Sequence, residues 1–271
     1  MKKYVQKLKQ NKLPVLLTFC AAVIVGAIFL YLSLTRLMPQ SAIFFLDDIN
    51  IPGPGEKVLV FSPHPDDETL GTGGFIYEST KKGAEVKIVL VTDGNKHGLK
   101  DLRYDEFKAA TKTLGVNENN LVFLGYPDGG LLKQNQDELY ARLKQEAVSF
   151  QPNVIVYPHD KDEHPDHATV AKVVDKIILD ENFRGESYQY LIHHHYYPDH
   201  RRYQPGRYLL PPATLVEFSR EWQKVLLPPD AESAKEKALR CYKSQLKTPI
   251  LKGLMLSLVR RNEVYMIGSS K

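Results

Sequence analysis

The chain has 271 residues, of which 36 are lysine or arginine and 32 are aspartate or glutamate, giving a formal net charge of +4. Six of the basic residues and none of the acidic ones lie in residues 1–36, so the rest of the chain holds 30 basic and 32 acidic residues, a net charge of −2. Because the basic excess belongs to the first segment alone, the composition does not favour nucleic acid as a partner.

A long apolar segment follows the lysine-rich start of the chain. Residues 15–34 form an uncharged run of 20 residues, which at ~1.5 Å per residue is long enough to cross a ~30 Å hydrocarbon core. The sequence therefore predicts a cytoplasmic lysine-rich tail over 1–14, a transmembrane anchor over 15–35 and a linker over 36–56. A cleaved signal peptide is the alternative, but the run is longer than a usual h-region and no A-x-A-like site follows it.

The charges that flank the predicted anchor indicate its orientation. Five lysines precede it, whereas Arg36 is the one basic residue that follows closely. Since the flank richer in lysine and arginine usually stays in the cytoplasm, we expect a single-pass protein of the cell membrane with a cytoplasmic N-terminus. The main domain, residues 57–271, is then expected to be extracytoplasmic.

Strand and helix patterns alternate in this main domain. Apolar runs and periodicities predict a strand over 57–61, a helix over 69–81, a strand over 85–92, a helix over 102–114, a strand over 121–124, a helix over 137–150 and a strand over 154–157. Such alternation predicts an α/β, Rossmann-like fold with a mostly parallel sheet and helices on both faces. Since Cys241 is the single cysteine of this domain, no internal disulfide is expected.

Polar clusters follow the four predicted strands. They are PHPDDE at 63–68, DGNKHG at 93–98, GYPDGG at 125–130 and PHDKDEHPDH at 158–167. Ligands of open parallel sheets bind at the carboxyl ends of the strands. We therefore expect these clusters to lie on one rim of the sheet.

The first and fourth clusters predict a metal site. A catalytic zinc commonly takes three protein ligands from histidine and carboxylate side chains and keeps a fourth position for water. His64 and either Asp66 or Asp67 can supply two ligands, and either His164 or His167 the third. The alternative is that these residues only cap the helices that follow. Two such clusters on rim loops of one sheet favour the metal site over caps alone.

These residues resemble the hallmarks of the PIG-L/LmbE-like zinc-dependent N-acetylglucosaminyl deacetylases, which are a P-H-P-D-D-E loop and a later H-P-D-H. Both stand in this chain unaltered, at 63–68 and 164–167. Weaker matches are TDG at 92–94, R-x-x-E and LG at 103–115, LGYPDGGL at 124–131, YLIH at 190–193, and YKSQL at 242–246 in an expected lysine-rich helix. The resemblance covers the chain from about residue 57 onward.

The resemblance implies a hydrolase that removes the N-acetyl group from an N-acetylated amino sugar, in a surface polysaccharide or a lipid-linked glycan. It implies His64, Asp67 and His167 as zinc ligands, with another divalent transition metal as the alternative ion. It also implies Asp66 as general base and a protonated His164 as the group that stabilises the oxyanion. Asp162 or Asp166 is expected to orient the imidazole of His164.

Substrate contacts are implied for Arg103, Asp128 and His193. The alternative for Arg103 is a surface salt bridge with Asp105 or Glu106. Side chains alternate faces along a strand, so His194 and His195 are expected to be exposed rather than to join His193 at one ion. The loop that follows is expected to be either solvated or a platform for a sugar; it contains Tyr196, Tyr197, Arg201, Arg202 and Tyr203.

Two other functions stay open at this point. One is the same chemistry on a non-glycan conjugate, and the other, in a different class, is a catalytically silent, membrane-anchored glycan-binding protein. Asp66 and His164 argue against the second, since a binding protein needs neither a base nor an oxyanion partner. The expected partners are an N-acetylated glycan or glycolipid and a lipid bilayer contacted by residues 15–35, without nucleic acid.

Overall fold

The computed structural model describes residues 2–35, 38–95, 98–195, 197–198, 201–217 and 221–268. Residues 1–39 and 40–271 form two compact units. Tyr196 of the expected loop, together with Lys96 and His97 of the second polar cluster, lies outside the described residues.

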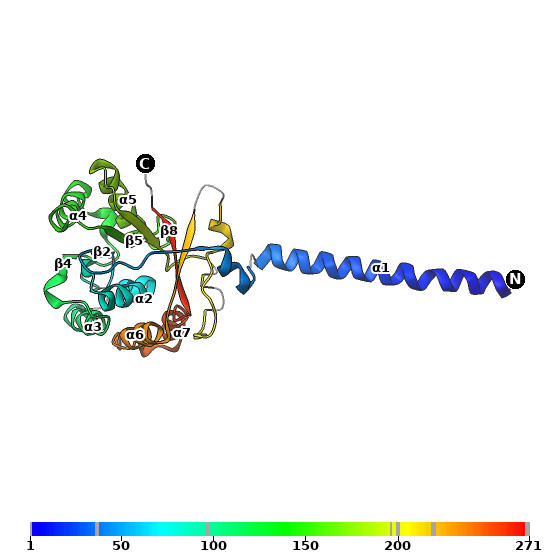
Figure 1. The fold of residues 1–271 in the computed structure, drawn as a ribbon. Helices are drawn as coiled ribbons and strands as arrows, with labels where there is room; N and C mark the ends of the chain where they lie inside the picture. The colour runs from blue at the N-terminus through cyan, green and yellow to red at the C-terminus, as the bar shows by residue number, and fades with distance from the viewer. Residues whose placement is uncertain are drawn as a thin grey trace. The chain divides into compact units, whose positions relative to one another are not determined.

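The second unit is built on a sheet that has eight strands within the described residues, in the order β1-β7-β8-β6-β5-β2-β3-β4 (Figure 1). The strands are β1 (Asp47–Asp48), β2 (Lys57–Ser62), β3 (Glu85–Thr92), β4 (Leu121–Tyr126), β5 (Val154–Pro158), β6 (Glu186–Tyr190), β7 (Trp222–Leu226) and β8 (Asn262–Ile267). The pairs from β6 through β4 are parallel. Strand β8 runs antiparallel to both β6 and β7. The predicted mixed α/β fold with a mostly parallel sheet is therefore present.

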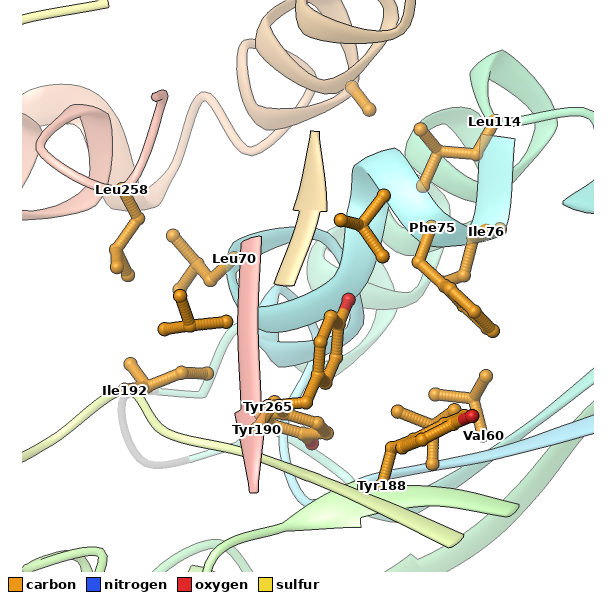
Figure 2. Close-up of a cluster of buried hydrophobic side chains, with 14 of the residues drawn as sticks. Val60, Leu70, Phe75, Ile76, Leu114, Tyr188, Tyr190, Ile192, Leu258 and Tyr265 are labelled. Carbon is orange, nitrogen blue, oxygen red and sulfur yellow. The ribbon is translucent and has the colours of Figure 1, made fainter. Parts of the chain in front are cut away.

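Helices cover both faces of this sheet. They are α2 (Asp67–Lys82), α3 (Lys100–Thr113), α4 (Gln136–Phe150), α5 (Pro165–Asp180), α6 (Pro229–Leu239) and α7 (Pro249–Leu256), with short 3₁₀ turns η1 (Gln40–Phe45), η2 (Glu118–Asn120), η3 (Leu131–Lys133), η4 (Ala213–Leu215) and η5 (Gln245–Lys247). Alternate residues of β2 enter two separate cores, because side chains of a strand point to opposite faces. Val58 and Val60 pack with α2, α3, α6 and α7, as Figure 2 shows for part of this core. Leu59 and Phe61 pack with α4 and α5.

The seven predicted strands and helices all occur, with ends that differ by at most two residues. Two other expectations differ from the structure. The segment predicted as a linker, 36–56, contains η1 and the edge strand β1, and its Ile43 and Ile49 are buried in the core. Residues 242–246 lie in turns and η5 after α6 rather than in a lysine-rich helix. Strand β1 forms by pairing with β7, which lies far along the chain. The sequence around residues 47–48 alone therefore does not predict this strand.

The first unit contains the helix α1 (Lys2–Thr35). The prediction that 15–35 is a transmembrane anchor is wrong, because no helix in the described part of the chain is both long enough and apolar enough to cross a bilayer. Four other expectations depended on that span and are given up with it. They are the membrane location, the cytoplasmic tail over 1–14, the extracytoplasmic domain and the bilayer contact.

The order of strands creates a crevice at the carboxyl ends of β2 and β5. The chain proceeds from β2 to β3 on one side, whereas β5 pairs with β2 on the other. Val58 pairs with Val154 and Val60 with Val156, so the two strands end at the same level. Ligands bind in open α/β sheets at such a switch point. The PHPDDE loop leaves β2 here and the PHDKDEHPDH loop leaves β5.

Helix α2 changes direction at Thr72, where the backbone is not helical (φ −145°). The helix restarts with the N–H groups of Gly74 and Phe75, which donate to the carboxylate of Glu263 on β8 at 2.8 and 2.9 Å. Glu263 also forms a buried ion pair of 2.6 Å with Lys235 of α6. The carboxylate thus satisfies donors that a helix start leaves unpaired, and it ties α2 to the last strand and to α6.

Candidate metal and catalytic site

The loop after β2 turns two neighbouring aspartates in different directions. Asp66 has a φ of 126°, a conformation that costs a non-glycine residue free energy and is found mainly at functional sites. Its side chain makes no cap hydrogen bond to α2, so the interpretation of Asp66 as a simple helix cap is not supported. Asp66 Oδ2 lies 3.1 Å from Arg103 Nη2, whereas Asp67 Oδ2 accepts from the backbone N–H of His64 at 2.8 Å.

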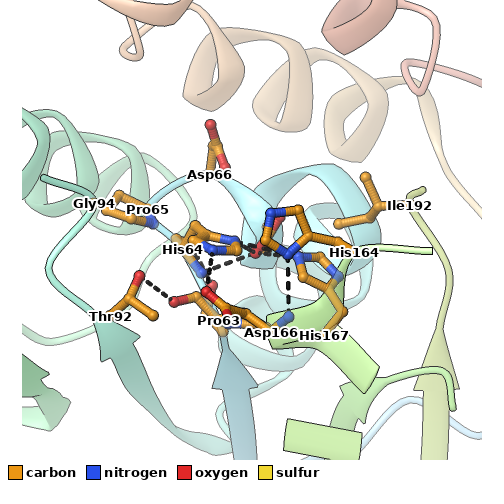
Figure 3. A network of polar contacts seen from close by, with 12 residues as sticks. Pro63, His64, Pro65, Asp66, Thr92, Gly94, His164, Asp166, His167 and Ile192 are labelled. Carbon is orange, nitrogen blue, oxygen red and sulfur yellow. Dashed lines mark hydrogen bonds and ion pairs between the residues drawn. The ribbon is translucent and has the colours of Figure 1, made fainter. Parts of the chain in front are cut away.

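Three potential ligand atoms meet beside this loop, and Figure 3 shows two of the residues that carry them, His64 and His167. Asp67 Oδ2 lies 3.0 Å from His64 Nδ1 and 2.9 Å from His167 Nε2, and the two nitrogens lie 3.3 Å apart. Zinc bound by nitrogen and oxygen at about 2.0–2.2 Å in a tetrahedral site has ligand atoms roughly 3.3–3.5 Å apart. The triangle of donors therefore fits a small divalent cation with a slight expansion.

Other combinations of side chains also bring potential ligand atoms within 4.8 Å of one another. These sets are His64, His164 and His167; Asp162, His167 and His193; and His64, Asp128 and Asp166. Their carboxylates differ from Asp67 in what they already bind. Asp162 accepts from three backbone N–H groups, and Asp166 accepts from two. Asp67 accepts from one backbone N–H group, that of His64.

Each of these two histidines has a buried carboxylate behind it. His64 Nε2 lies 3.2 Å from Asp166 Oδ2, on the side of the ring opposite to Asp67. His167 Nδ1, a buried atom with no hydrogen bond of good geometry, faces Asp162 Oδ2 at 3.2 Å. Metal-binding histidines commonly have such a partner at the other ring nitrogen, which fixes the tautomer and the ring orientation.

The neighbouring carboxylates raise the pKa of both histidines. Burial lowers the pKa of His64, but hydrogen bonds to Asp166 and Asp67 outweigh it and raise the pKa to about 9. Burial likewise opposes protonation of His167, yet Asp162 and Asp67 raise its pKa well above the usual value. The site therefore carries an excess of negative charge, which a cation held by the same atoms would compensate.

Asp66 lies in a different environment from Asp67. Burial raises the pKa of Asp66 to about 7, although the nearby Arg103 guanidinium opposes this. Burial also acts on Asp67, but His167 and His64 hold its pKa well below the usual range. Neighbouring acids whose pKa values are pushed apart can take different chemical roles.

His164 is the N-cap of α5, and it also lines the cavity. Its Nδ1 accepts from the backbone N–H of Asp166 at 3.3 Å, so a neutral ring carries its proton on Nε2. Burial, together with the neighbouring His64 and His167, lowers the pKa of His164 to about 4. This lowered pKa favours a neutral ring, which donates a hydrogen bond through Nε2, over the protonated His164 that the resemblance implies.

The sequence led us to expect that Asp162 or Asp166 orients the ring of His164, but neither side-chain carboxylate faces this ring, and Asp166 reaches it only through its backbone N–H. Asp162 accepts from the backbone N–H of His164 at 2.9 Å, while its carboxylate faces the rings of His167 and His193. Asp166 faces His64. The HPDH pattern holds both acids close to the histidines, but spacing alone does not report which ring each acid faces.

Arg103 is buried and does not form the surface salt bridge considered as its alternative. Its guanidinium donates to Asp66 at 3.1 Å, to the carbonyl of Pro65 at 2.6 Å and to Asp128 at 3.5 Å. Its Nε has no hydrogen-bond partner among the described residues. Asp128 is also 3.4 Å from His64 Nε2. Arg103 and Asp128 thus form a charged wall beside Asp66.

A cavity of about 380 Å³ opens beside these groups. Its lining includes His64, Asp66, Asp67, Arg103, Asp128, His164 and His193, and His194 lies there too. Of the predicted site residues, His167 alone is absent from the lining, since it is fully buried beneath His64 and Asp67. Cavities of ~300–1,000 Å³ commonly hold small ligands, so the site has room for one sugar-sized molecule.

Sequence analysis missed the opposite wall of this cavity. Leu251, Leu254 and Met255 of α7 and the following Leu258 line it. Their i, i+3, i+4, i+7 spacing is the available signal, since it marks one face of a helix. The same pattern also describes a core-facing helix, and it does not indicate that the face meets a site.

Fold and site together define a doubly wound α/β domain with a histidine–aspartate site at its topological switch point. Residues 59–178 match the family model described as PIG-L: GlcNAc-PI de-N-acetylase. This stretch is a PIG-L-type domain, as the PHPDDE and HPDH patterns predicted. It contains β2 to β5 with α2 to α4 and most of α5, and therefore both polar loops of the site.

The chain is similar to several deacetylases. Diacetylchitobiose deacetylase of Thermococcus kodakarensis is 29% identical over 124 residues, which are 41% of this chain and 45% of that protein. A 1D-myo-inositol 2-acetamido-2-deoxy-alpha-D-glucopyranoside deacetylase of Streptomyces scabiei is 29% identical over 170 residues, 49% of this chain and 52% of that protein. The matches thus span about half the length of these relatives. The predicted enzyme class, a de-N-acetylating hydrolase, is the class of these relatives.

A solved structure has the same fold. The N,N'-diacetylchitobiose deacetylase from Pyrococcus horikoshii superimposes with a TM-score of 0.59 at 23% identity, covering 78% of this chain and 83% of that one. The superposition extends beyond the PIG-L match and includes the larger part of the second unit.

Proposed function

We propose that this chain is a metal-dependent hydrolase that removes the N-acetyl group from an N-acetylated amino sugar such as N-acetylglucosamine. One observation carries the proposal: Asp67 Oδ2, His64 Nδ1 and His167 Nε2 converge within 2.9 to 3.3 Å beside a cavity. Asp66 and His164 line that same cavity. The similarity to named deacetylases of N-acetylglucosamine compounds supports the choice of substrate class.

His64, Asp67 and His167 would hold the cation, for which zinc is the first choice because the donor set contains two imidazoles and one carboxylate. When bound, such a cation supplies a Lewis acid for the amide carbonyl and lowers the pKa of water. Asp166 and Asp162 hold the rings of His64 and His167 in position through their outer nitrogens.

Asp66 is the proposed general base. It takes a proton from the attacking water and gives a proton to the leaving amine, while the new C–O bond forms and the C–N bond breaks. The neutral His164 donates its Nε2–H to the carbonyl oxygen as negative charge develops there. The products are acetate and the free amino sugar. Arg103 holds the carboxylate of Asp66 at 3.1 Å and so fixes its direction.

Arg103 and Asp128 are proposed to contact the sugar hydroxyls, since both line the cavity and both carry charge. His193 stands across the cavity, and its ring is 38% exposed and faces Asp162. It is proposed as a further hydroxyl contact. The expectation of a surface polysaccharide as the natural substrate depended on the predicted transmembrane anchor, so it is not part of this proposal. A lipid-linked glycan remains within the proposal, since the apolar side chains of Leu251, Leu254 and Met255 also line the cavity.

The test uses the full chain, treated with a chelator and then supplied with zinc. N-acetylglucosamine glycosides are incubated with it, and both acetate and free amine are quantified. We expect one acetate and one amine for each amide cleaved, loss of turnover after chelation, and recovery with zinc. Absence of both products with zinc and with other divalent transition metals would refute the proposed function.

A further inference from the structure

The backbone at Asp66 depends on its surroundings for its shape. Its φ of 126° is a conformation that a non-glycine residue keeps only where neighbouring groups hold it. The backbone N–H of Asp66 donates to Glu68 Oε2 at 3.2 Å, and Glu68 is fully buried. The proposed base therefore stands on a strained backbone that a neighbouring carboxylate supports.

The carboxylate of Glu68 also joins the first turn of α2 to the end of β2. Its Oε2 lies 3.3 Å from Ser62 Oγ, and the backbone N–H of Glu68 donates to that hydroxyl at 3.2 Å. Ser62 Oγ donates in turn to the carbonyl of His64 at 2.8 Å. Glu68 and Ser62 thus hold both ends of the loop that carries His64, Asp66 and Asp67.

The other oxygen of Glu68 contacts a residue far along the chain. The hydroxyl of Tyr242, in the turn after α6, donates to Glu68 Oε1 at 2.5 Å. Thr69 Oγ1 donates to the same oxygen at 2.5 Å. Tyr242 and Glu68 are both 0% exposed, so water does not compete for this contact. Tyr242 therefore holds one oxygen of the carboxylate while Asp66 binds the other.

The arrangement leaves one route by which Tyr242 can affect the reaction. Asp66 lines the cavity, whereas Glu68 and Tyr242 are not among the residues that line it. Neither side chain is therefore placed to touch a substrate. An effect of Tyr242 on turnover has to pass through Glu68 and the loop.

We propose that Glu68 and Tyr242 are positioning residues for Asp66. The Tyr242 hydroxyl fixes the Glu68 carboxylate, and this carboxylate holds the Asp66 backbone in the conformation that places its side chain at the cavity. The inference rests on the proposed function, in which Asp66 is the general base. It gives a part in the reaction to a residue of the C-terminal segment, outside the stretch 59–178 that matches the family model.

Tyr242→Phe tests the contact, because it removes one hydroxyl and keeps the buried ring. Displacement of a reacting group by about 1 Å can cost about 10²-fold in rate, and loss of one contact among several allows a smaller shift. We expect kcat for the methyl glycoside of N-acetylglucosamine to fall roughly tenfold, with KM and bound zinc unchanged. The zinc-loaded full chain is used, and free amine is quantified.

Tyr265→Phe is the matched control. Tyr265 is also 0% exposed, and its hydroxyl donates to Thr72 of α2 at 2.9 Å and to the buried carboxylate of Glu263 at 2.7 Å. The control therefore removes the same group from a similar contact, on the same helix but away from the loop. Urea unfolding should show a similar loss of stability for both variants, while kcat of Tyr265→Phe stays within twofold of the unsubstituted chain.

Two substitutions of Glu68 test the middle of the connection. Glu68→Ala leaves the backbone N–H of Asp66 without this acceptor and should lower kcat by about 10²-fold. Glu68→Gln keeps one oxygen for that N–H and adds an amide nitrogen that can donate to the Tyr242 hydroxyl, so it should recover most of the loss. Far-ultraviolet circular dichroism checks that both variants fold.

A double substitution separates positioning of Asp66 from a general loosening of the domain. If Tyr242 acts through Asp66, adding Tyr242→Phe to Asp66→Asn should change the residual kcat by less than twofold, since the base is already absent. If removal of the hydroxyl only loosens the domain, kcat falls by the same factor in both backgrounds. That second result overturns the inference.

The remaining outcomes distinguish this inference from the proposed function. Turnover of Tyr242→Phe within twofold of the unsubstituted chain overturns the inference and leaves the deacetylase function standing. A fall in kcat accompanied by loss of bound zinc also overturns it, since the effect would then lie at the metal ligands. Absence of free amine with the unsubstituted chain removes the proposed function and the inference together.

Discussion

Asp162 provides a stringent test of the site because its carboxylate has many partners. Oδ1 accepts from the backbone N–H of His164 at 2.9 Å, and Oδ2 accepts from those of Ile192 and His193 at 3.0 Å each. Oδ2 also faces His167 Nδ1 at 3.2 Å. In Asp162→Asn one of these oxygens becomes an amide nitrogen, which cannot accept a hydrogen bond.

Two separate losses are expected from this substitution. Loss of a buried partner behind a metal-binding histidine typically reduces metal affinity about 10- to 100-fold, or roughly 1.4–2.7 kcal/mol. One or two buried backbone N–H groups lose their acceptor, which costs about 1–3 kcal/mol of folding stability. For a domain of this size that loss lowers Tm by roughly 2–10 °C.

Measuring the two losses separately identifies the role of Asp162. Zinc affinity is measured by competition with a chromophoric chelator, and stability is measured by urea unfolding of the chelator-treated chain. Asp175→Asn is the control, since Asp175 is another acid on the same domain, on α5, but it contacts Tyr157 and Gln189 instead of the site. Zinc affinity of Asp162→Asn within twofold of the unsubstituted chain would show that the carboxylate does not support a metal ligand.

Three further predictions follow from the geometry. Asp67→Ala and His167→Ala should each reduce bound zinc well below the ~1 ion per chain expected of the unsubstituted protein, as measured by elemental analysis; unchanged content in both would remove them as ligands. Asp66→Asn should retain zinc but lose about 10²- to 10⁴-fold in kcat, and near-normal turnover would exclude it as the base. Lys235→Met leaves Glu263 as an unpaired buried charge and should cost about 3–5 kcal/mol in urea unfolding, with a smaller loss when Glu263→Gln is added; equal losses would contradict the ion pair.

The parallel part of the sheet was predictable because its strands are apolar over their whole length, as expected of strands that are buried on both faces. The strands β2, β3 and β5 are buried on both faces and read as continuous apolar runs. Turn and cap residues mark the ends of the helices between them. The edge strand β1 has two exposed residues, so no apolar pattern identifies it. Its existence depends on pairing with β7.

The contents of the site were predictable from the sequence, but several of its contacts were not. The two polar clusters follow strands that end at one level, and so their side chains meet. The sequence does not report that Asp162 faces His167 and His193, and the lowered pKa of His164 results from burial beside His64 and His167. The prediction of an anchor over 15–35 rested on composition alone, and no helix in the described part of the chain is long and apolar enough to cross a membrane.

The contact between Glu263 and the restart of α2 has a consequence for the order of events during synthesis. The proposed ligands, the base and the charged wall all lie before residue 170, but the carboxylate that caps the second half of α2 comes from the last strand. A nascent chain that has left the ribosome only as far as α5 therefore has all these chemical groups while α2 still lacks its partner. Stable assembly of the site is therefore expected only after residue 263 has left the ribosome, so the site forms late relative to the synthesis of its own side chains.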